Sequence, residues 1–237
     1  MSRRTEIRDQ RLRRRRRTTT ILTLAIVGVA LIITAFMIAQ NNRPIGAILT
    51  PEPRAYSRTS GQSIGDPNAP VKIDEFSDFQ CPYCRVFHEE TFPQILRDYV
   101  ETGKVYFTYR NFPVVGGGSS GGESMDAAVA SVCAGQQGKF FEFHDLLFAN
   151  QTGENIGDFA ERRLYAMAEI AGLEADAFDQ CYKSGASAAV VDSDRATGLQ
   201  AGVNSTPSFL INGTPFLGAQ PYAEFQKVID AALAAAS

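Results

Sequence analysis

The longest apolar run in the chain extends from Ile21 to Ala39 and contains no charged residue. It is about as long as the roughly 20 residues that an α-helix needs to cross a bilayer. Arginines crowd the segment before it, and positive charge marks the cytoplasmic side of a membrane helix. The pattern predicts a basic cytoplasmic tail over residues 1–20 and a single-pass anchor over 21–39. A cleaved signal peptide is the competing interpretation, although its apolar region is usually shorter.

The segment after the apolar run has no regular period. Residues 40–62 are mostly polar and contain three prolines. This composition is typical of an extended linker, because proline stiffens the chain and lacks a backbone donor. We therefore expect a folded extracytoplasmic domain over residues 63–237.

A strand–helix–strand pattern opens this domain. Residues 71–76 (Val-Lys-Ile-Asp-Glu-Phe) are typical of a buried strand, and a helical pattern covers residue 85 to about residue 100. Residues 104–110 alternate β-branched and aromatic side chains, as a second strand does. Two strands joined through a helix usually lie parallel with a right-handed crossover. We expect a βαβ unit here.

Helical patterns dominate the middle of the domain. The Gly- and Ser-rich stretch 115–123 predicts a flexible surface loop, and no lysine follows its glycines as a phosphate-binding loop would require. A block of helices should follow over residues 124–201, because Gly, Asn or similar breakers bound each apolar-periodic segment. The expected helices cover residues 125–135, 140–149, 156–171, 175–183 and 188–201.

The C-terminal part returns to strands. Residues 208–211 and 214–217 are expected to form a hairpin, since Asn212-Gly213 between them is a preferred two-residue turn. Pro215 favours an edge position for the second strand. A final helix over 221–235 carries its apolar residues on one face. The predicted order is β-α-β, a helical insertion, then β-β-α, which is an α/β domain.

The net charge of −3 hides an asymmetry along the chain. Nine arginines against two acidic residues give residues 1–20 a charge of +7, which leaves −10 for the remainder. An arginine cluster can bind nucleic acid. This cluster adjoins an apolar run, however, and the folded domain is acidic. We therefore expect no nucleic-acid partner.

The stretch Cys81-Pro82-Tyr83-Cys84 carries the chemistry. It lies between the first strand and the first helix, where unpaired backbone N–H groups and the helix dipole stabilise an anion. A thiolate at Cys81 would be the nucleophile of disulfide exchange, and Cys84 one turn later would be the resolving cysteine. Half of a zinc site and a purely structural bridge are the competing interpretations. A zinc site would need two further ligands, and no second Cys-x-x-Cys or His pair is present.

With Cys-x-x-Cys opening the first helix, the element order resembles the thioredoxin fold, and the helical insertion resembles its DsbA-like branch. Three stretches carry the resemblance: 76–84 around the cysteines, 138–148 in the insertion and 203–213 with its Thr-Pro dipeptide. The family often has Trp where Phe141 stands. The resemblance covers residues 63–237 and implies a thioredoxin-like fold preceded by one transmembrane helix.

The resemblance also implies a substrate-facing wall. Pro207 matches the family's cis-proline, whose preceding residue, here Thr206, pairs with extended substrate. Pro82 and Tyr83 lie between the cysteines and should also face substrate. Tyr83 departs from the His that DsbA-like enzymes often have there, so the helix terminus and nearby backbone must stabilise the thiolate.

Glu75 lies on the first strand, six residues before Cys81. In the family, an acidic residue at this position lies beneath the disulfide and moves a proton to or from the resolving cysteine. A partly buried carboxyl group has a raised pKa that suits this task. The alternative is a surface glutamate, and the pattern leaves open which of Asp74, Glu75 and Asp78 points inward.

The two remaining cysteines, Cys133 and Cys181, both fall in the helical insertion. If Cys81 and Cys84 pair with each other, a structural disulfide between Cys133 and Cys181 remains, and an extracytoplasmic location favours it. Two buried free thiols are the alternative.

The function implied is that of a thiol:disulfide oxidoreductase at the cell membrane, most simply an oxidase of secreted or membrane proteins. Its partners would be reduced or misoxidised polypeptides and a membrane redox partner that recycles the active-site cysteines. We expect no metal or organic cofactor, and we expect His88 and His144 to be packing or surface residues. Two rivals stay open: a reductase or isomerase of the same fold, and a non-catalytic membrane-tethered binding or chaperone module.

Overall fold

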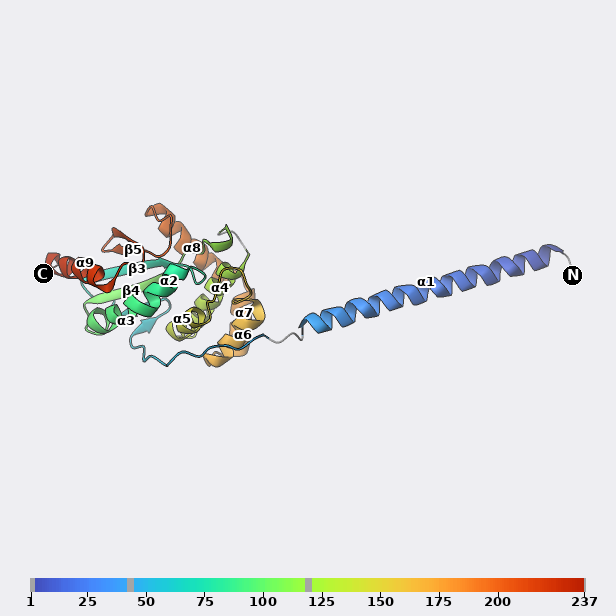
Figure 1. The fold of residues 1–237 in the computed structure, drawn as a ribbon, viewed down its shortest axis with the longest axis horizontal. Helices are drawn as coiled ribbons and strands as arrows, with labels where there is room; N and C mark the ends of the chain where they lie inside the picture. The colour runs from blue at the N-terminus through green and yellow to red at the C-terminus, as the bar shows by residue number, and fades with distance from the viewer. Residues whose placement is uncertain (1–2, 42–44, 118–120, 237) are drawn as a thin grey trace. The chain divides into compact units, whose positions relative to one another are not determined.

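A computed structural model describes residues 3–41, 45–117 and 121–236, and these divide into two units, Met1–Gly46 and Ala47–Ser237. The first unit contains the long helix α1 (Arg3–Asn41), drawn in blue in Figure 1. Its segment Thr19–Met37 has a mean hydropathy of 2.5, and α1 is the one helix among the described residues long and apolar enough to span a membrane. This segment overlaps the expected anchor. Parts of the predicted tail, linker and Gly/Ser-rich loop (1–2, 42–44 and 118–120) lie outside the described residues.

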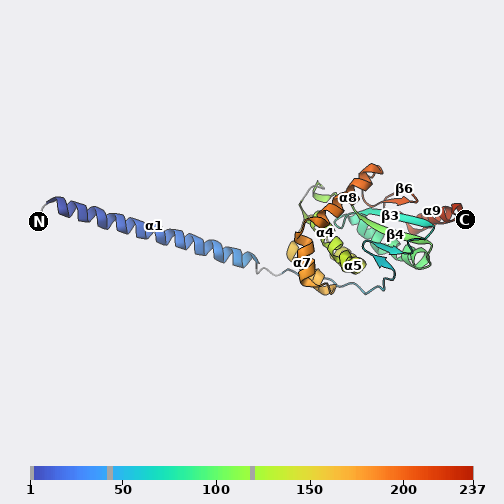
Figure 2. The same ribbon diagram turned by 180° about the vertical axis from the view of Figure 1, so that it is seen from behind.

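The second unit is built around one mixed sheet with the strand order β1-β2-β4-β3-β5-β6 (Figures 1 and 2). The central strands β3 and β4 are parallel, and every other neighbouring pair is antiparallel. The strands are β1 (Thr59–Ser60), β2 (Ser63–Gly65), β3 (Val71–Ser77), β4 (Val105–Asn111), β5 (Ser208–Ile211) and β6 (Thr214–Leu217).

Helices follow the predicted order. Between β3 and β4 runs a continuous helical segment made of α2 (Pro82–Val86), η1 (Phe87–Thr91), α3 (Phe92–Ile95) and η2 (Leu96–Val100). A short turn η3 (Val115–Gly117) precedes the insertion, and α9 (Tyr222–Ala235) follows β6. The insertion comprises α4 (Glu123–Gln136), α5 (Phe140–Ala149), α6 (Glu161–Ile170), α7 (Ala175–Lys183) and α8 (Ala186–Gln200).

This architecture is the predicted thioredoxin-like fold with a helical insertion. The insertion helices gather towards one end of the sheet, and α9 lies towards the other end (Figure 2). The turn prediction is confirmed as well: Asn212 and Gly213 both have positive φ, at 47° and 80°, as a tight hairpin turn requires. The strand with Pro215 lies at the sheet edge, as predicted.

Two stretches of the helix that follows the cysteines are π-helical, η1 and η2. At the end of η1 the Phe92 N–H donates to the carbonyl of Phe87, five residues back. Pro93, which comes next, has no N–H and its ring would clash with a carbonyl in a regular α-helix. A one-residue π-bulge is a common way to absorb such a conflict. The helix therefore continues through the proline.

The two faces of β3 and β4 pack against different layers. Glu75 and Tyr109 are register partners on the face covered by α2, α3 and α9, where the main core lies. The opposite face carries Phe76 and is covered by α8. Gly198 of α8 allows this close approach, since a Cβ atom there would lie 2.7 Å from the Phe112 ring and 2.8 Å from the Phe76 ring. Alternation along one strand thus separates two environments.

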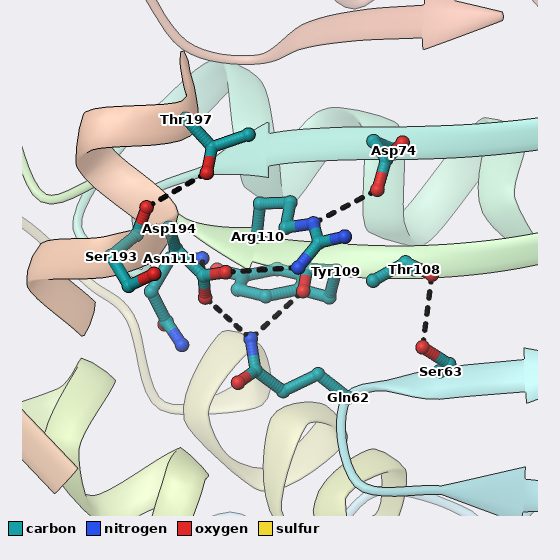
Figure 3. Close-up of polar contacts among 10 residues, drawn as sticks. All are labelled: Gln62, Ser63, Asp74, Thr108, Tyr109, Arg110, Asn111, Ser193, Asp194 and Thr197. Carbon is teal, nitrogen blue, oxygen red and sulfur yellow. Dashed lines mark hydrogen bonds and ion pairs between the residues drawn. The ribbon is translucent and has the colours of Figure 1, made fainter. Parts of the chain in front are cut away.

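A polar network ties the α8 face of the sheet to the insertion (Figure 3). The Arg110 Nε donates to Asp74 at 2.9 Å, and its Nη1 donates to the buried Asp194 of α8 at 3.2 Å. The other Asp194 oxygen accepts from the Gln62 amide at 2.8 Å and from the Asn111 backbone N–H at 3.1 Å. One guanidinium group therefore balances carboxylates on two elements.

The start of the compact unit differs from the predicted one. It begins at Ala47, and residues 47–62, which were expected to be linker, pack on the domain. The Leu49 backbone N–H and C=O both bond to the Asn150 side chain at 2.9 and 2.8 Å, and β1 joins the sheet edge. These contacts are irregular or only two to three residues long, so they leave no periodic signal in the sequence.

One helix starts later than expected. The predicted segment 156–171 becomes helical only at Glu161. The backbone N–H groups of Gly157 and Phe159 donate instead to the Glu123 carboxylate, at 2.7 and 2.8 Å. A carboxylate from another helix thus holds this stretch in a loop.

Candidate functional site

The two cysteines of the motif have unequal environments. Cys81 is the N-cap of α2, Pro82 occupies the first helical turn, and Cys84 lies one turn further along the helix. Cys81 is 7% exposed, whereas Cys84 is fully buried. Tyr83, between them, is 67% exposed, and Pro82 is exposed as well. Of the two cysteines, only Cys81 therefore keeps any exposure to solvent.

The environment of Cys81 favours its thiolate. The Cys84 thiol, as hydrogen-bond donor, lowers the pKa of Cys81 to about 6, against burial that raises it. The Thr206 hydroxyl and the backbone N–H groups of Tyr83 and Cys84 lower it further. These N–H groups belong to the first helical turn, where they have no partner within the helix. The backbone N–H groups expected from the sequence therefore contribute, but the largest contribution comes from the Cys84 thiol, which the sequence analysis did not name as a source of stabilisation.

Cys84 has the opposite preference. Burial raises the pKa of Cys84 well above its usual value, and the neighbouring Cys81 and Glu75 charges raise it further. The second sulfur is therefore held as a protonated thiol in the reduced form.

Glu75 lies buried beneath the motif, at 2% exposure. Desolvation raises the pKa of this carboxyl group to about 8, although the Ser77 hydroxyl lowers it and the Cys81 charge adds to the rise. Asp74 points to the other face of the sheet and pairs with Arg110. A carboxyl group with a pKa near 8 can both give and accept a proton near neutral pH.

The Thr206–Pro207 loop faces the reactive sulfur. The peptide bond between these residues is cis, the isomer that the resemblance implies. The Cys81 thiol lies 3.4 Å from the Thr206 carbonyl oxygen. Pro207 is buried and Thr206 is half-buried. The structure thus brings together Cys81, Thr206 and Pro207, which lie far apart in the sequence.

Asp78 was not singled out by the sequence, where it was one of three carboxylates around the motif. Its buried carboxylate accepts from the Gln80 N–H at 2.8 Å and from the Ser124 hydroxyl at 2.7 Å. It also accepts from the backbone N–H groups of Val114 and Val115 at 2.8 and 2.9 Å. Asp78 therefore fastens the loop after β4 and the start of α4 to the segment that leads into Cys81.

Cys133 and Cys181 are joined in a disulfide, with Sγ–Sγ 2.07 Å and Cα–Cα 5.7 Å. The bridge connects α4 to α7 within the insertion. It lies outside the Cys81–Cys84 motif, whose two sulfurs are free.

His88 and His144 meet in the core together with Asp145, a convergence that their sequence spacing did not indicate. His88 Nε2 and His144 Nδ1 each lie 3.5 Å from Asp145 Oδ1, and all three residues are buried. Burial lowers the pKa of both histidines. The Asp145 carboxylate also accepts from the Tyr56 hydroxyl at 2.8 Å, and the Arg54 guanidinium lies 3.7 Å away. Since Arg54 already balances its charge, we interpret the cluster as packing that fastens residues 47–56.

Comparison with known proteins agrees with this geometry. A family model described as thioredoxin matches residues 57–231, which is most of the folded unit. The chain belongs to the thioredoxin family. A probable disulfide bond formation protein D of Bacillus anthracis is 30% identical over 179 residues, covering 74% of this chain and 79% of that protein.

Two solved structures have a similar fold. BdbD from Bacillus subtilis, in its oxidised form, has a TM-score of 0.66 at 23% identity and covers 80% of this chain and 100% of that chain. Wolbachia pipientis alpha-DsbA1 has a TM-score of 0.65 at 26% identity, covering 79% and 95%. This thioredoxin-family chain is therefore a DsbA-like thiol:disulfide oxidoreductase. Its apolar helix α1 and its family together support a membrane-anchored, extracytoplasmic domain.

Proposed function

We propose that this protein forms disulfide bonds in secreted or membrane polypeptides, with Cys81 as the reactive sulfur and Cys84 as its resolving partner. The observation that carries the proposal is the asymmetry of the pair. Cys81 keeps slight exposure and is stabilised as a thiolate, whereas Cys84 is fully buried and stabilised as a thiol. Stabilising the reduced form in this way makes a disulfide more oxidising.

The exchange proceeds in two steps from the oxidised enzyme. A substrate thiolate attacks Cys81 Sγ, the Cys81–Cys84 bond breaks, and Cys84 leaves as a thiolate that takes a proton from Glu75. A second substrate thiolate then attacks the substrate sulfur of the mixed disulfide, which forms the new disulfide and releases Cys81 as a thiolate. The substrate has lost two electrons and the enzyme has gained them. A disulfide-bearing membrane partner would remove these electrons and restore the Cys81–Cys84 bond.

Four residues would hold the substrate. Thr206 and Pro207 form a wall beside Cys81, and the exposed Pro82 and Tyr83 border it on the helix side. A polypeptide in extended conformation could pair with the backbone at Thr206, while its cysteine reaches Cys81. We place α1 across the cell membrane with the basic residues 1–20 in the cytoplasm, in keeping with the positive-inside bias.

The Cys133–Cys181 bridge has a structural role in this proposal. Loop-entropy reasoning for its separation of 48 residues gives a stabilisation of about 3–4 kcal/mol. Its removal should lower thermal stability without abolishing disulfide exchange at low temperature.

The test uses the full-length protein in detergent, oxidised beforehand, with a reduced and unfolded substrate that requires disulfides to regain activity. We expect stoichiometric oxidation of substrate thiols by the wild type and none by Cys81→Ser, whereas Cys133→Ser with Cys181→Ser should keep the exchange. If Cys81→Ser still oxidises the substrate, the proposed chemistry is wrong. Loss of exchange in the double variant at a temperature where it stays folded would contradict the structural role of the second bridge.

A further inference from the structure

Residues 47–56, which we call the strap, lie on the insertion and meet one buried carboxylate. The Tyr56 hydroxyl donates to Asp145 and lies 2.8 Å from each of its carboxylate oxygens. The Arg54 guanidinium lies 3.7 Å from the same carboxylate. Asp145 is 5% exposed, and a buried carboxylate needs hydrogen bonds and a counter-charge. The strap supplies both.

Two histidines are the other possible source of positive charge at Asp145. His88 Nε2 and His144 Nδ1 each lie 3.5 Å from its Oδ1 atom. Burial lowers the pKa of both histidines, and the Arg54 charge lowers each further, whereas Asp145 raises that of His144. Among the described residues, His88 Nδ1 has no hydrogen-bond partner, so a proton there would be an unpaired buried donor. Both rings are therefore neutral while the strap is docked.

The rest of the surroundings is mostly aromatic. Tyr109 of β4 is titratable and lies edge-on to His144, with ring centroids 5.2 Å apart, but burial raises its pKa and it stays neutral. Phenylalanine rings make the other aromatic contacts with the two histidines: Phe79, Phe92, Phe140, Phe141 and Phe148. Glu52 and Glu142 line the cavity beside the strap and add negative charge only. Arg54 is therefore the cation that acts on both histidines.

We propose that the strap and a proton compete for Asp145, and that acid therefore releases the strap from the domain. In the docked state Arg54 balances the carboxylate and both histidines are neutral. When the strap leaves, Arg54 and Tyr56 leave with it, and the carboxylate stays in the folded domain without its cation. One histidine, His88 or His144, then takes a proton from water and becomes the new counter-ion. One carboxylate balances one cation, so release takes up one proton.

Acid weakens docking because the histidine binds its proton only after the strap has left. Its pKa lies below the ordinary 6.5 in the docked state and at or above 6.5 in the released state, where Asp145 is its partner. Docking is therefore strongest above pH 6.5 and weakens as the pH falls through that value. For one proton, the ratio of released to docked strap rises at least about tenfold from pH 7.5 to pH 5.5. Release adds residues 47–56 to the tether that follows α1, and at about 3.3–3.6 Å per extended residue its reach grows by roughly 35 Å.

The test follows cleavage of the strap by thermolysin at pH 5.5 and pH 7.5, in the full-length protein in detergent, with products identified by mass. Each rate is divided by that of a free peptide of residues 45–58 at the same pH, which cancels the pH dependence of the protease. When docking is fast compared with cleavage, this quotient reports the population of released strap. Asp145→Asn removes the negative charge but keeps an oxygen for Tyr56. Asn150→Ala is the matched control, because it removes the two hydrogen bonds of the strap at Leu49 without removing a charge.

We expect the quotient to be at least about tenfold higher at pH 5.5 than at pH 7.5 in the wild type. Asn150→Ala should raise the quotient at both pH values and keep the tenfold ratio between them. Asp145→Asn should bring that ratio within about twofold of one, because neither cation then has a carboxylate to balance. A wild-type ratio within twofold of one, or a tenfold ratio that persists in Asp145→Asn, overturns the proposal.

A second measurement needs no cleavage and keeps the proposal testable if Asp145→Asn does not fold. The chain has two histidines, so NMR of labelled imidazole rings in the full-length protein follows each of them against pH. Arg54→Gln removes the competing cation and should raise the proton affinity of one histidine about tenfold or more. Arg54→Lys keeps the charge and should titrate as the wild type does. Equal titration of both histidines in Arg54→Gln and the wild type overturns the proposal.

Discussion

The low pKa of Cys81 leads to a prediction that separates the contribution of the Cys84 hydrogen bond from the other causes of this pKa shift. The largest cause that lowers this pKa is the hydrogen bond from the Cys84 thiol. Cys84→Ala removes the donor, whereas Cys84→Ser replaces it with a hydroxyl donor of similar reach. With Cys133 and Cys181 bridged, both variants keep Cys81 as their single free thiol.

The magnitude follows from the strength of such a bond. A hydrogen bond to a charged group contributes about 1.5–3 kcal/mol, which corresponds to about one to two pKa units. Cys81 should therefore titrate near pH 6 in Cys84→Ser and between roughly pH 7 and pH 8 in Cys84→Ala. At pH 7 the thiolate fraction would fall from about nine-tenths to between about one-half and one-tenth.

The same shift has a consequence for the redox couple. A thiol pKa of about 6 in place of the ordinary 9 favours the reduced form at pH 7 by about 1.4 kcal/mol. For a two-electron couple this is about 30 mV towards the oxidising side. The contribution is present above the folded pKa and is lost as the pH falls through 6, because the thiolate is then protonated.

The assay is the rate of alkylation of Cys81 by iodoacetamide against pH, followed by intact mass, for both variants in detergent. Only the thiolate reacts, so the midpoint of the rate profile reports the pKa. Two results would refute the reasoning. Equal midpoints in the two variants would show that the Cys84 donor does not matter, and a midpoint near 9 in Cys84→Ser would show that the helix terminus does not stabilise the thiolate.

Three further predictions concern stability, measured by urea unfolding of the full-length protein in detergent. Glu75→Gln should stabilise the domain by a few kcal/mol at pH 8 but little at pH 4.5. The pKa of Glu75 is raised in the folded state, so the wild type loses stability as the pH rises from 4.5 to 8, and glutamine removes this loss. An equal effect at both pH values would contradict this. Arg110→Ala should lower the free energy of unfolding by roughly 2–3 kcal/mol, since it leaves the buried Asp194 carboxylate without its cation. A decrease below about 0.5 kcal/mol would contradict a stabilising role of the network. Gly198→Ala should lower the free energy of unfolding by about 1–3 kcal/mol, because the added methyl group overpacks the contact with the sheet. Gly135→Ala should cost less, because a Cβ atom there would have its nearest contacts at 3.5 Å. The reverse order would show that α8 can move away from the sheet.

The order of elements could be predicted from the sequence because each core element has a clear period of apolar residues or ends in a recognisable turn. The alternating strand before the cysteines, the Asn212-Gly213 turn and the apolar face of α9 all fold as local pattern indicates. The short strands β1 and β2 could not be predicted, since two or three residues cannot show alternation. β2 is held by pairing with β4, which is a tertiary contact, and β1 is held by pairing with β2.

The site was predicted where a motif fixes it and missed where only three-dimensional packing does. Cys81 and Cys84 follow from one short stretch, but the inward direction of Glu75 was left open between three carboxylates. Alternation along β3 places Glu75 towards the cysteines, and the Arg110 pair takes Asp74 to the other face. Asp78 gave no signal of its role, because the groups that donate to it include Val114, Val115 and Ser124, which lie far from it in the sequence.

The separation of the two faces of β3 has a consequence for how this protein can change. Substitutions of β3 residues that face the cysteines alter the proton affinity of the site. Substitutions of β3 residues that face α8 alter how the insertion packs on the sheet. No side chain belongs to both faces. Oxidising strength and mechanical attachment of the insertion can therefore vary independently in descendants or in designed variants. A deletion of one residue within the strand is the exception, because it exchanges the faces and disables both properties in a single step.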